Sequence, residues 1–400
     1  MPQPRFIQIH FLASYPGVLL NRDDAGLAKR LPFGGATRTR VSSQSLKRHW
    51  RRADDARSIH ALGEEEGIAS ARSKRAIEER VTKDLRDRVD EETAKAVEDV
   101  FVKAVYGSNA TDPKKRQALL LGYPELAYLR ENAERIAGEA ADAKDAKARA
   151  EAFFKEGDGK ANLKQLRDQN GVVASLDAAL FGRMVTSDPR ANTDAAIHVA
   201  HAFTVHDEEP EQDYFTVVDD LTGRSEDNED GDTGAAGVFD TELTSGLFYG
   251  YVVVDVPLLV SNLSGVRRSE WAADTTERDL PARVVENLIH LVATVSPGAK
   301  KGSTAPYSWA EAVLVEMGDR QPRTLANAFR GPIPLRGKET LSARTGAAIK
   351  GELDDLDAMY GADEVRLLAA RGDIAFDGPE CMALDVLAER VAGAVRGAAL

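Results

Sequence analysis

The sequence predicts an α+β protein in which strand-forming segments near both ends frame a long helical insertion. Residues 6–11 alternate in polarity as a strand does, and strand-like runs return after residue 207. Between them, residues 54–180 are rich in Ala, Glu, Arg and Lys with few β-branched residues. With 400 residues, 43% of them hydrophobic, the chain can bury a core, which excludes wholesale disorder.

The first predicted strand has two faces that the alternation of its side chains defines. Ile7, Ile9 and Phe11 are expected to face the core, with Phe6, Gln8 and His10 on the opposite side. A polar loop at residues 21–24 and a glycine pair at Gly34–Gly35 follow this strand.

A short basic helix is predicted next, beginning at Ser42–Ser43, which can cap its first turn. Leu46, Trp50 and Ala53 recur at helical spacing and give this helix one apolar stripe.

The long middle region, residues 54–180, is expected to be a helical subdomain interrupted near residues 107–109 and 122–124. Its part at 138–159 is either a poorly packed helix or a loop. Further on, strands are expected at 247–259 and 312–317, a helix at about 286–294, and helices over the Ala/Leu-rich residues 341–400.

Residues 207–242 are the most acidic part of the chain. They hold 14 acidic residues and one base, Arg224, and two strand-like pieces, 214–218 and 236–242, frame a tip rich in Gly, Asp and Asn. This pattern predicts a β-hairpin with a solvated acidic loop.

Cysteine content and hydropathy exclude two classes of protein. The single cysteine, Cys381, cannot form an internal disulfide or a cysteine zinc site, which fits a reducing cytoplasm. The longest apolar run, residues 247–260, contains Asp255 and Pro257 and is shorter than the about 20 residues that a membrane span needs. Residues 1–20 do not have the pattern of a signal peptide. A cytoplasmic protein is expected.

The charge of the chain is unevenly distributed. The formal net charge is −13, yet residues 1–57 hold 11 Lys and Arg against four acids. Because salt screens charges beyond about 8–10 Å, a local basic patch on an acidic body can still bind phosphates.

The predicted basic helix concentrates this positive charge. Its first backbone N–H groups and the hydroxyls of Ser42, Ser43 and Ser45 favour an anion, and Lys47 with Arg51 and Arg48 with Arg52 place like charges one turn apart. Either Asp54 and Asp55 or the phosphates of a nucleic acid are expected to offset that repulsion.

Four other groups of residues could suggest a phosphate-binding, metal-binding or base-binding site, but each also has an ordinary structural interpretation. The Gly34–Gly35 pair lacks the residues of a phosphate-binding P-loop, and His198, His201 and His206 match no metal-binding spacing, so ordinary core or surface histidines are favoured. Asp23 and Asp24 suit a turn better than a divalent metal site. Met184 is expected either to fill the core or to press on a base.

Several blocks of the sequence together resemble one known family. They occur in a consistent order from residue 6 to about 330, whereas residues 61–181 and the part beyond 335 match weakly. The blocks are Phe6–His10, Asn21–Asp24, Phe33–Gly35, Arg40–Arg48, Gly182–Met184, Ala200–Ala202, Phe215–Asp220, Ser245–Tyr249, Pro297–Lys300 and Leu325–Phe329. They resemble the CasC family, the repeated backbone subunits of type I-E CRISPR Cascade complexes.

The resemblance implies a hand-like α+β fold: an RRM-like (ferredoxin-like) palm, inserted helical fingers and a β-hairpin thumb. The implied division is 1–60 for the first part of the palm, 61–181 for the fingers, 182–206 for the second part of the palm, 207–242 for the thumb, and 243–400 for the rest of the palm with C-terminal helices.

The resemblance also implies a function. Family members are non-catalytic and need no cofactor; copies stack along the spacer of a CRISPR RNA (crRNA), grip its backbone and leave its bases free to pair with target DNA. The implied partners are crRNA, target DNA through pairing, other copies of the chain, and the subunits CasA, CasB, CasD and CasE.

Motif by motif, the resemblance assigns RNA-binding roles to 13 residues. Backbone contacts are implied for most, interleaving with bases for Met184, and wedging at a kink of the RNA for the two thumb aromatics. The residues are Lys29, Arg40, Ser42, Gln44, Ser45, Lys47, Arg48, Arg51, Met184, Tyr214, Phe215, Lys300 and Lys301. The thumb tip at 225–234 is longer and more acidic than the family pattern and is expected to face solvent or a protein partner.

Two other functions are compatible with parts of the sequence. Type III relatives of these backbone subunits cleave target RNA with a loop aspartate and a metal, a role that Asp23 or Asp24 would fill. A protein-only interaction module would use the acidic thumb, but it leaves the clustered N-terminal bases unexplained.

Overall fold

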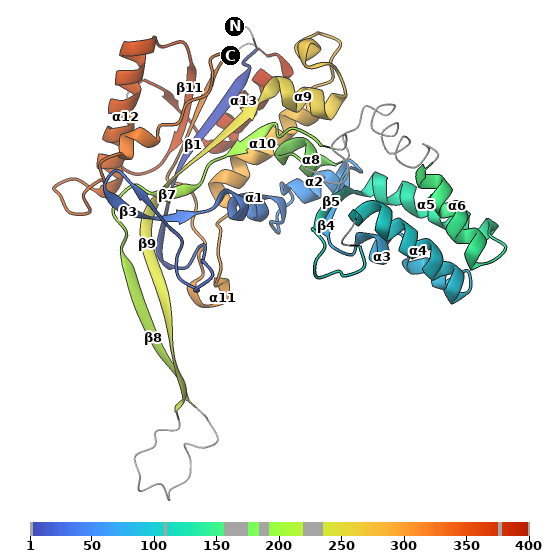
Figure 1. Cartoon of the computed structure of the whole chain (residues 1–400). Helices are drawn as coiled ribbons and strands as arrows, with labels where there is room; N and C mark the ends of the chain where they lie inside the picture. The colour runs from blue at the N-terminus through green and yellow to red at the C-terminus, as the bar shows by residue number, and fades with distance from the viewer. Residues whose placement is uncertain are drawn as a thin grey trace, which may run out of the picture.

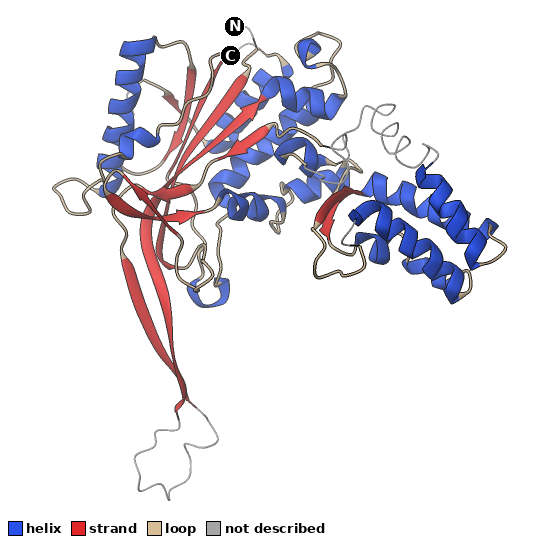
Figure 2. Ribbon diagram, in the orientation of Figure 1, coloured by secondary structure: helices blue, strands red, loops and turns tan. Residues whose placement is uncertain are grey.

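A central β-sheet with helices on both faces organises the molecule, and a long hairpin and a separate helical unit project from it (Figure 1). The computed structural model describes residues 3–107, 110–155, 175–183, 192–218, 235–374 and 378–398. The fold is a mixed α+β fold with one large sheet, as the sequence predicts (Figure 2).

In the described residues, ten strands join in this sheet. Along its path the order is β12-β11-β10-β1-β9-β7-β3-β2, and β6 and β8 also pair with β9. The strands are β1 (Phe6–Val18), β2 (Arg30–Phe33), β3 (Ala36–Val41), β6 (Ile197–Val199), β7 (Ala202–Thr204), β8 (Pro210–Val218), β9 (Ala235–Asp255), β10 (Ala312–Gly318), β11 (Val365–Ala370) and β12 (Glu380–Cys381).

The helices cover the sheet and build the lateral unit. They are α1 (Ser43–Arg51), α2 (Ile59–Glu65), α3 (Ala76–Arg80), α4 (Glu91–Tyr106), α5 (Tyr123–Glu139), α6 (Ala143–Lys155), α8 (Leu176–Phe181), α9 (Val256–Ser264), α10 (Asp279–Thr294), α11 (Lys301–Thr304), α12 (Leu341–Tyr360) and α13 (Leu384–Arg396), with the 3₁₀ turns η1 (Lys83–Asp87), η5 (Arg268–Glu270) and η6 (Ala326–Phe329). None of the helices within the described ranges is both long and apolar enough to cross a membrane.

Strand β9 links the sheet to the hairpin. Its first half pairs with β8, and its second half pairs with β1 from Gly246 to Asp255. The predicted hairpin is therefore confirmed, but the two strands expected at 236–242 and 247–259 are one continuous strand. It ends at Asp255, whose side chain caps α9 by accepting from the Leu258 N–H at 3.0 Å.

Both faces of β1 are buried, which corrects the expectation of a half-buried strand. Ile7 and Ile9 pack into one core beneath α10 and α13, as predicted. On the opposite face, Gln8 and His10 are also buried, because α12 and η6 cover that side with Ile349 and other apolar residues. Alternation within one strand indicates which residues share a face, but not whether another element covers it.

The helical unit has a core of its own, made by α3 to α6. Phe101 and Phe153 stack within it at 5.8 Å between ring centroids. The segment left open as helix or loop is helix α6 over its described part, and it packs through Ala146 and Ala150. A two-stranded sheet of β4 (Ser70–Ser73) and β5 (Leu119–Gly122) lies at its base, where the sequence predicts only helices.

The C-terminal region also departs from the prediction. Between α12 and α13, β11 extends the main sheet antiparallel to β10, and β12 adds to it in parallel. The Ala/Leu-rich composition indicates the two helices but hides the short strand of residues 365–370.

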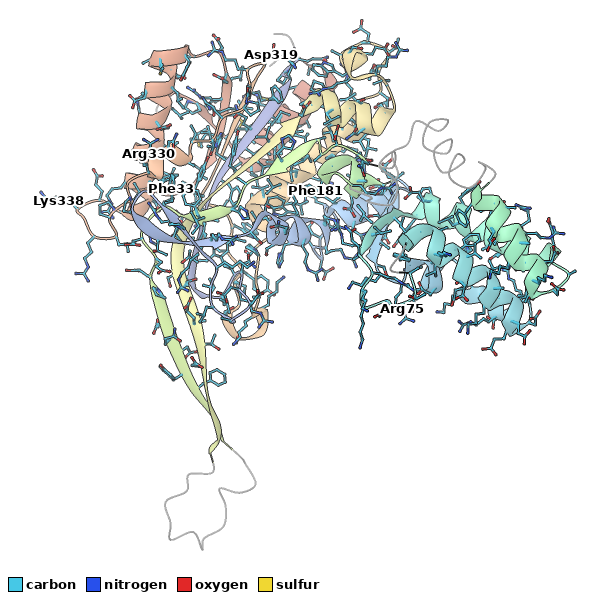
Figure 3. All side chains as sticks on the ribbon, viewed as in Figure 1. Phe33, Arg75, Phe181, Asp319, Arg330 and Lys338 are labelled. Carbon is cyan, nitrogen blue, oxygen red and sulfur yellow. The ribbon has the colours of Figure 1, made fainter. Side chains whose placement is uncertain are left out.

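The glycine pair Gly34–Gly35 connects β2 and β3 and gives a matched test of packing. Both glycines have positive φ, +62° and +80°. A Cβ on Gly34 would lie 1.5 Å from the carbonyl oxygen of Arg330, whereas a Cβ on Gly35 would meet nothing within 4 Å. Figure 3 shows Phe33 and Arg330 close together on this flank.

We expect Gly34→Ala to destabilise the protein about 1–3 kcal/mol more than Gly35→Ala, because both variants pay the cost of positive φ but only the first must move the 330 backbone. Urea unfolding followed by circular dichroism measures both. If both variants lose the same free energy of unfolding, the turn can adjust to the new Cβ without moving the backbone at Arg330.

Candidate nucleic-acid interface

Helix α1 forms as its sequence predicts and presents its basic residues away from the core. The Ser42 hydroxyl caps it by accepting from the Ser45 N–H at 3.3 Å. Leu46 and Trp50 are buried, while Gln44 and Arg48 are exposed. The apolar stripe that anchors the helix therefore directs Arg48 to solvent.

The start of α1 is partly satisfied from within the protein. His201 accepts at Nδ1 from the Ser43 N–H and from the Arg40 guanidinium, both at 3.3 Å. Burial lowers the pKa of His201, and the charges of Arg40 and Lys29 lower it further, so the ring is a neutral acceptor. Lys29 lies beside Arg40, whose backbone N–H donates to the Lys29 carbonyl at 2.8 Å. Arg40 and Lys29 are thus gathered at the helix start, where the sequence predicts an anion.

A groove of about 330 Å³ runs between α1, α8 and the β4–β5 sheet. Its charged lining holds four bases against one acid, so it attracts anions. The lining residues are Gln44, Lys47, Arg48, Arg51, Arg72, Leu120, Asp177 and Phe181.

Of the four bases of this groove, only Arg51 has an ion pair among the described residues, and Lys47 and Arg48 are two of the three without one. Among the described residues no carboxylate lies within ion-pair distance of either. The Lys47 ammonium lies 5.2 Å from the centre of the Phe181 ring, and burial lowers the pKa of Lys47. Figure 3 shows Phe181 between the sheet and the helical unit. A phosphate here would gain a pair of cations without displacing an existing ion pair.

Arg51, unlike Lys47 and Arg48, forms an ion pair inside the protein. Its guanidinium donates two hydrogen bonds of 2.7 Å to Asp177 of α8, which also accepts from the Ser70 hydroxyl of β4. The charge on this side of α1 is therefore offset by Asp177 rather than by Asp54 or Asp55, the internal partners that the sequence suggests. Arg51 joins α1 to the base of the helical unit.

The loop before α11 is attached to the same helix. His49 of α1 is bonded at Nδ1 to the Ser45 carbonyl at 2.7 Å and accepts at Nε2 from the Gly298 N–H at 3.3 Å. Burial lowers the pKa of His49, which keeps it neutral for this bridge. Two residues on, the Lys300 ammonium donates to the Thr241 hydroxyl of β9, and Lys301 is exposed. Lys300 and Lys301 thus lie between α1 and the hairpin.

Two aromatic residues of the hairpin are accessible. Tyr214 is 70% exposed and Phe215 43% exposed, on β8 opposite Asp240 and Phe239 of β9. Met184 and the tip at 225–234 lie outside the described residues.

The acids at the start of the chain form a turn. The Asp23 carboxylate accepts from the backbone N–H groups of Ala25 and Leu27 at 2.9 and 3.0 Å, which fixes the loop before β2. Asp24 is exposed. Within the part of the chain that the structure describes, no three His, Cys, Asp or Glu residues are grouped so that they could hold a metal ion.

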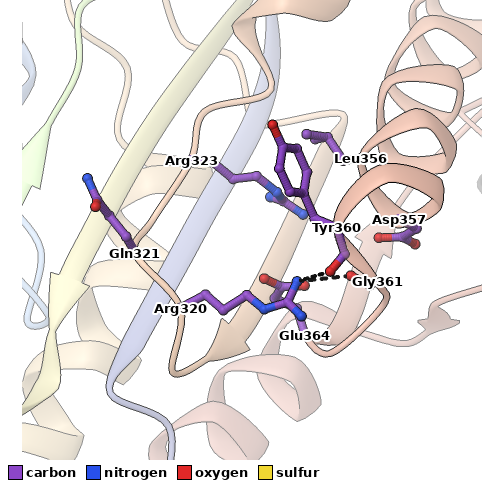
Figure 4. A pocket seen from close by; sticks show the side chains of 8 residues that line it. All are labelled: Arg320, Gln321, Arg323, Leu356, Asp357, Tyr360, Gly361 and Glu364. Carbon is purple, nitrogen blue, oxygen red and sulfur yellow. Dashed lines mark hydrogen bonds between the residues drawn. The ribbon is translucent and has the colours of Figure 1, made fainter.

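A second cavity, of about 450 Å³, lies between the loop after β10 and the end of α12 (Figure 4). Its arginines already have partners: Arg320 donates to the Tyr360 and Gly361 carbonyls, and Arg323 donates to Glu316. This cavity offers less free positive charge than the groove beside α1.

Sequence reasoning missed several residues of the groove. Arg72, Asp177 and Phe181 lie far from α1 in sequence, within the region that was expected to be a helical scaffold. Only their position beside α1 in the folded chain distinguishes them. The sequence predicts an ordinary core or surface histidine at position 201, and nothing in its spacing indicates the contact with Ser43.

A family model and solved structures each match almost the whole chain. A family described as "CT1975-like protein" matches residues 7–390. One solved structure, titled "CRISPR RNA-guided surveillance complex, pre-nicking", has 26% identity and a TM-score of 0.74, covering 98% of this chain and 100% of that chain. Another, titled "CRISPR RNA-guided surveillance complex", is similar in fold at 23% identity and a TM-score of 0.63, covering 96% of this chain and 99% of that chain. No curated protein matches the chain.

The family match spans nearly the whole chain, including β1, the basic helix, the hairpin and the C-terminal helix. The chain belongs to the Cas_CT1975 family of CT1975-like proteins.

Proposed function

We propose that the chain is the non-catalytic, crRNA-binding backbone subunit of a type I-E CRISPR Cascade surveillance complex. In this function it assembles with copies of itself along the spacer of the guide and displays the bases for pairing with target DNA in antiviral defence. The partners would be crRNA and the subunits CasA, CasB, CasD and CasE, in the cytoplasm. The titles of the similar solved structures support a place in such a complex.

One observation carries the proposal: in the part of the chain that the structure describes, Lys47 and Arg48 lie at a basic groove without an acidic partner, although the net charge of the chain is −13. In so acidic a chain, unpaired bases concentrated at one groove indicate a polyanionic ligand. Lys29 and Arg40 extend this surface at the start of α1, and Lys300 and Lys301 extend it toward the hairpin.

Such a surface suits the backbone of RNA rather than its bases. Cations bind phosphates regardless of sequence, so reading of the target is left to base pairing, as in other RNA-guided complexes. The chain order β1, α1, β6–β7, β9, α10, β10 with the sheet order β10-β1-β9-β7 supports an RRM-like palm. The helical unit would be the fingers, 61–181, and the hairpin the thumb, 207–242.

The direct test is to express the chain with its genomic neighbours and a CRISPR array, purify the complex and sequence the RNA bound to it. Uniform repeat–spacer units are expected. Heterogeneous RNA would indicate a general single-strand binder, and a complex free of RNA would overturn the proposal.

A charge-reversal variant tests the groove itself. Lys47→Glu with Arg48→Glu is expected to reduce the RNA recovered to below about a tenth of wild type, because two phosphate contacts become repulsive. The same reversal at Lys95 and Lys103, exposed on α4, is the matched control and should retain the RNA. Full RNA recovery from the α1 variant, with an unchanged circular dichroism spectrum, would contradict the assignment.

A further inference from the structure

Two large aromatic side chains are exposed in the segment between α11 and β10. Tyr307 is 74% exposed and Trp309 70% exposed. Exposure alternates along this segment: Pro306 is buried, Ser308 is half-buried and the aromatic residues on either side of it are exposed. Both rings are therefore directed to solvent by the same stretch of backbone.

Specific contacts hold this segment in place. Ala305 has φ of +41°, the one positive φ outside glycine in the described residues, and this conformation turns the chain at the end of α11. The next residue, Pro306, packs so closely on Gly298 that a Cβ there would lie 2.7 Å from the proline ring. The Ser296 hydroxyl bonds both the N–H and the carbonyl of Ser308, at 2.9 and 2.8 Å. Strained backbone that the surrounding structure enforces is typical of functional sites.

The segment is also continuous with the basic surface described above. Gly298, on which Pro306 packs, donates to His49 of α1 at 3.3 Å. Lys300 and Lys301 precede the aromatic residues by a few positions, and the one acid in residues 295–311, Glu311, accepts from the Ser342 hydroxyl at 2.7 Å. Within residues 295–311, two lysines therefore stand against a single acid.

We propose that Tyr307 and Trp309 stack on nucleobases of single-stranded RNA, while Lys301 binds a neighbouring phosphate. This inference rests on the proposed function and adds a base-stacking site to its backbone contacts. Aromatic rings beside cations are the usual means of binding single strands without sequence preference, because every base has a π-face. Exposed Tyr and Trp also suit a protein partner, but lysine is depleted in protein–protein interfaces, so the lysines beside this pair favour RNA.

Tryptophan fluorescence gives a direct test with the full chain. Of the three tryptophans, Trp50 is buried and Trp271 is half-buried against the core, so quenching by an RNA ligand would report on Trp309. We expect an oligouridylate of about 12 nucleotides to quench the wild type and not Trp309→Phe, which keeps a stacking ring. The affinity of an end-labelled oligouridylate, measured by anisotropy, should fall about 10- to 100-fold in the Tyr307→Ala/Trp309→Ala variant and little in Trp309→Phe.

Tyr360→Ala is the matched control, since Tyr360 is 59% exposed beside the other cavity, where the arginines are already bonded (Figure 4). It should bind as the wild type does. If the double alanine variant binds normally, or if it loses only self-association, the stacking site is refuted while the proposed function stands. The proposed function fails, and the stacking site with it, if two results occur together. The wild type would bind no oligouridylate, and the RNA recovered with the purified complex would be the same for the wild type and for Lys47→Glu/Arg48→Glu.

Discussion

Replacement of Glu316 by glutamine is expected to destabilise the protein by about 3–5 kcal/mol, the usual cost of removing one partner from a buried ionic network. Glu316 on β10 is fully buried and accepts two hydrogen bonds from Arg323, of 2.6 and 2.9 Å, and one of 2.9 Å from Arg366. Its carboxylate also bonds Nε2 of the buried His10 at 3.2 Å. Glutamine would leave two half-buried guanidinium groups without their shared negative charge. The midpoint of urea unfolding measures the loss.

This network also gives stability a defined dependence on pH. Burial opposes ionisation of Glu316, but hydrogen bonds from Arg323 and His10, with their charges, outweigh it and hold its pKa well below the usual 4.5. A depressed carboxyl pKa stabilises the fold fully above the unfolded value and progressively less as the pH falls below it. His10, whose pKa burial lowers from 6.5, acts with the same sign, because the unfolded chain takes up its proton first.

We therefore expect the wild type to lose stability from about pH 6.5 downward, and most steeply below about pH 4.5. In Glu316→Gln the free energy of unfolding should fall less steeply at acid pH (the acid limb of the stability curve), because the titrating carboxylate is gone. Asp355→Asn, an exposed change on α12, is the control and should leave both the neutral stability and the acid limb nearly unchanged. Parallel acid limbs in wild type and Glu316→Gln would show that other groups dominate acid unfolding.

Asp177→Asn is the second change with a large expected effect, also about 3–5 kcal/mol. Asp177 is 6% exposed and binds Arg51 of α1 through both carboxylate oxygens, while Ser70 of β4 donates to it. Asparagine would leave the Arg51 charge largely buried and uncompensated. Because this cluster joins α1 to the base of the helical unit, RNA retention should also fall as the groove loses its shape.

Two comparisons make this prediction specific. The double variant Arg51→Met/Asp177→Leu removes both charges and should recover much of the lost stability, since apolar replacement of a whole buried pair is often neutral. Glu380→Gln breaks the exposed pair with Arg390 and should cost no more than about 1 kcal/mol. If urea unfolding gives Asp177→Asn a loss as small as that of Glu380→Gln, the Arg51 contact is not a structural anchor.

Local patterns in the sequence predicted local structure well. The alternation of residues 6–11 identified β1 and its inward face, Ser42 was identified as the cap of α1, and the acidic segment was identified as a hairpin. For β1 and the cap of α1 the determining interactions lie within a few residues along the chain, and for the hairpin they lie within one contiguous segment. The periods of strand and helix, and the cap that a serine offers, are properties of that short range.

Predictions failed where a distant element decides the outcome. Alternation predicts that Gln8 and His10 lie on the outer face of a half-buried strand, yet residues more than 300 positions later contact them: the Arg323 N–H donates to Gln8, and Glu316 bonds His10. The strands β4 and β5 are only four residues each and pair across the whole of α3 and α4, so no periodic pattern marks them. The sequence gives no sign that Tyr307 and Trp309 are exposed, because whether an aromatic residue is buried depends on how the rest of the chain packs around it.

For the candidate interface, the sequence alone determined which residues carry the charge: the bases clustered in residues 1–57 and the helix that displays them. Only the tertiary structure decided which of those charges are free. Arg51 is bound by an aspartate 126 residues away, while Lys47 and Arg48 are left at a groove whose far wall is supplied by β4 and α8. The physical reason is that periodicity and composition act along the chain, whereas ion pairing and desolvation depend on distances in space that only packing sets.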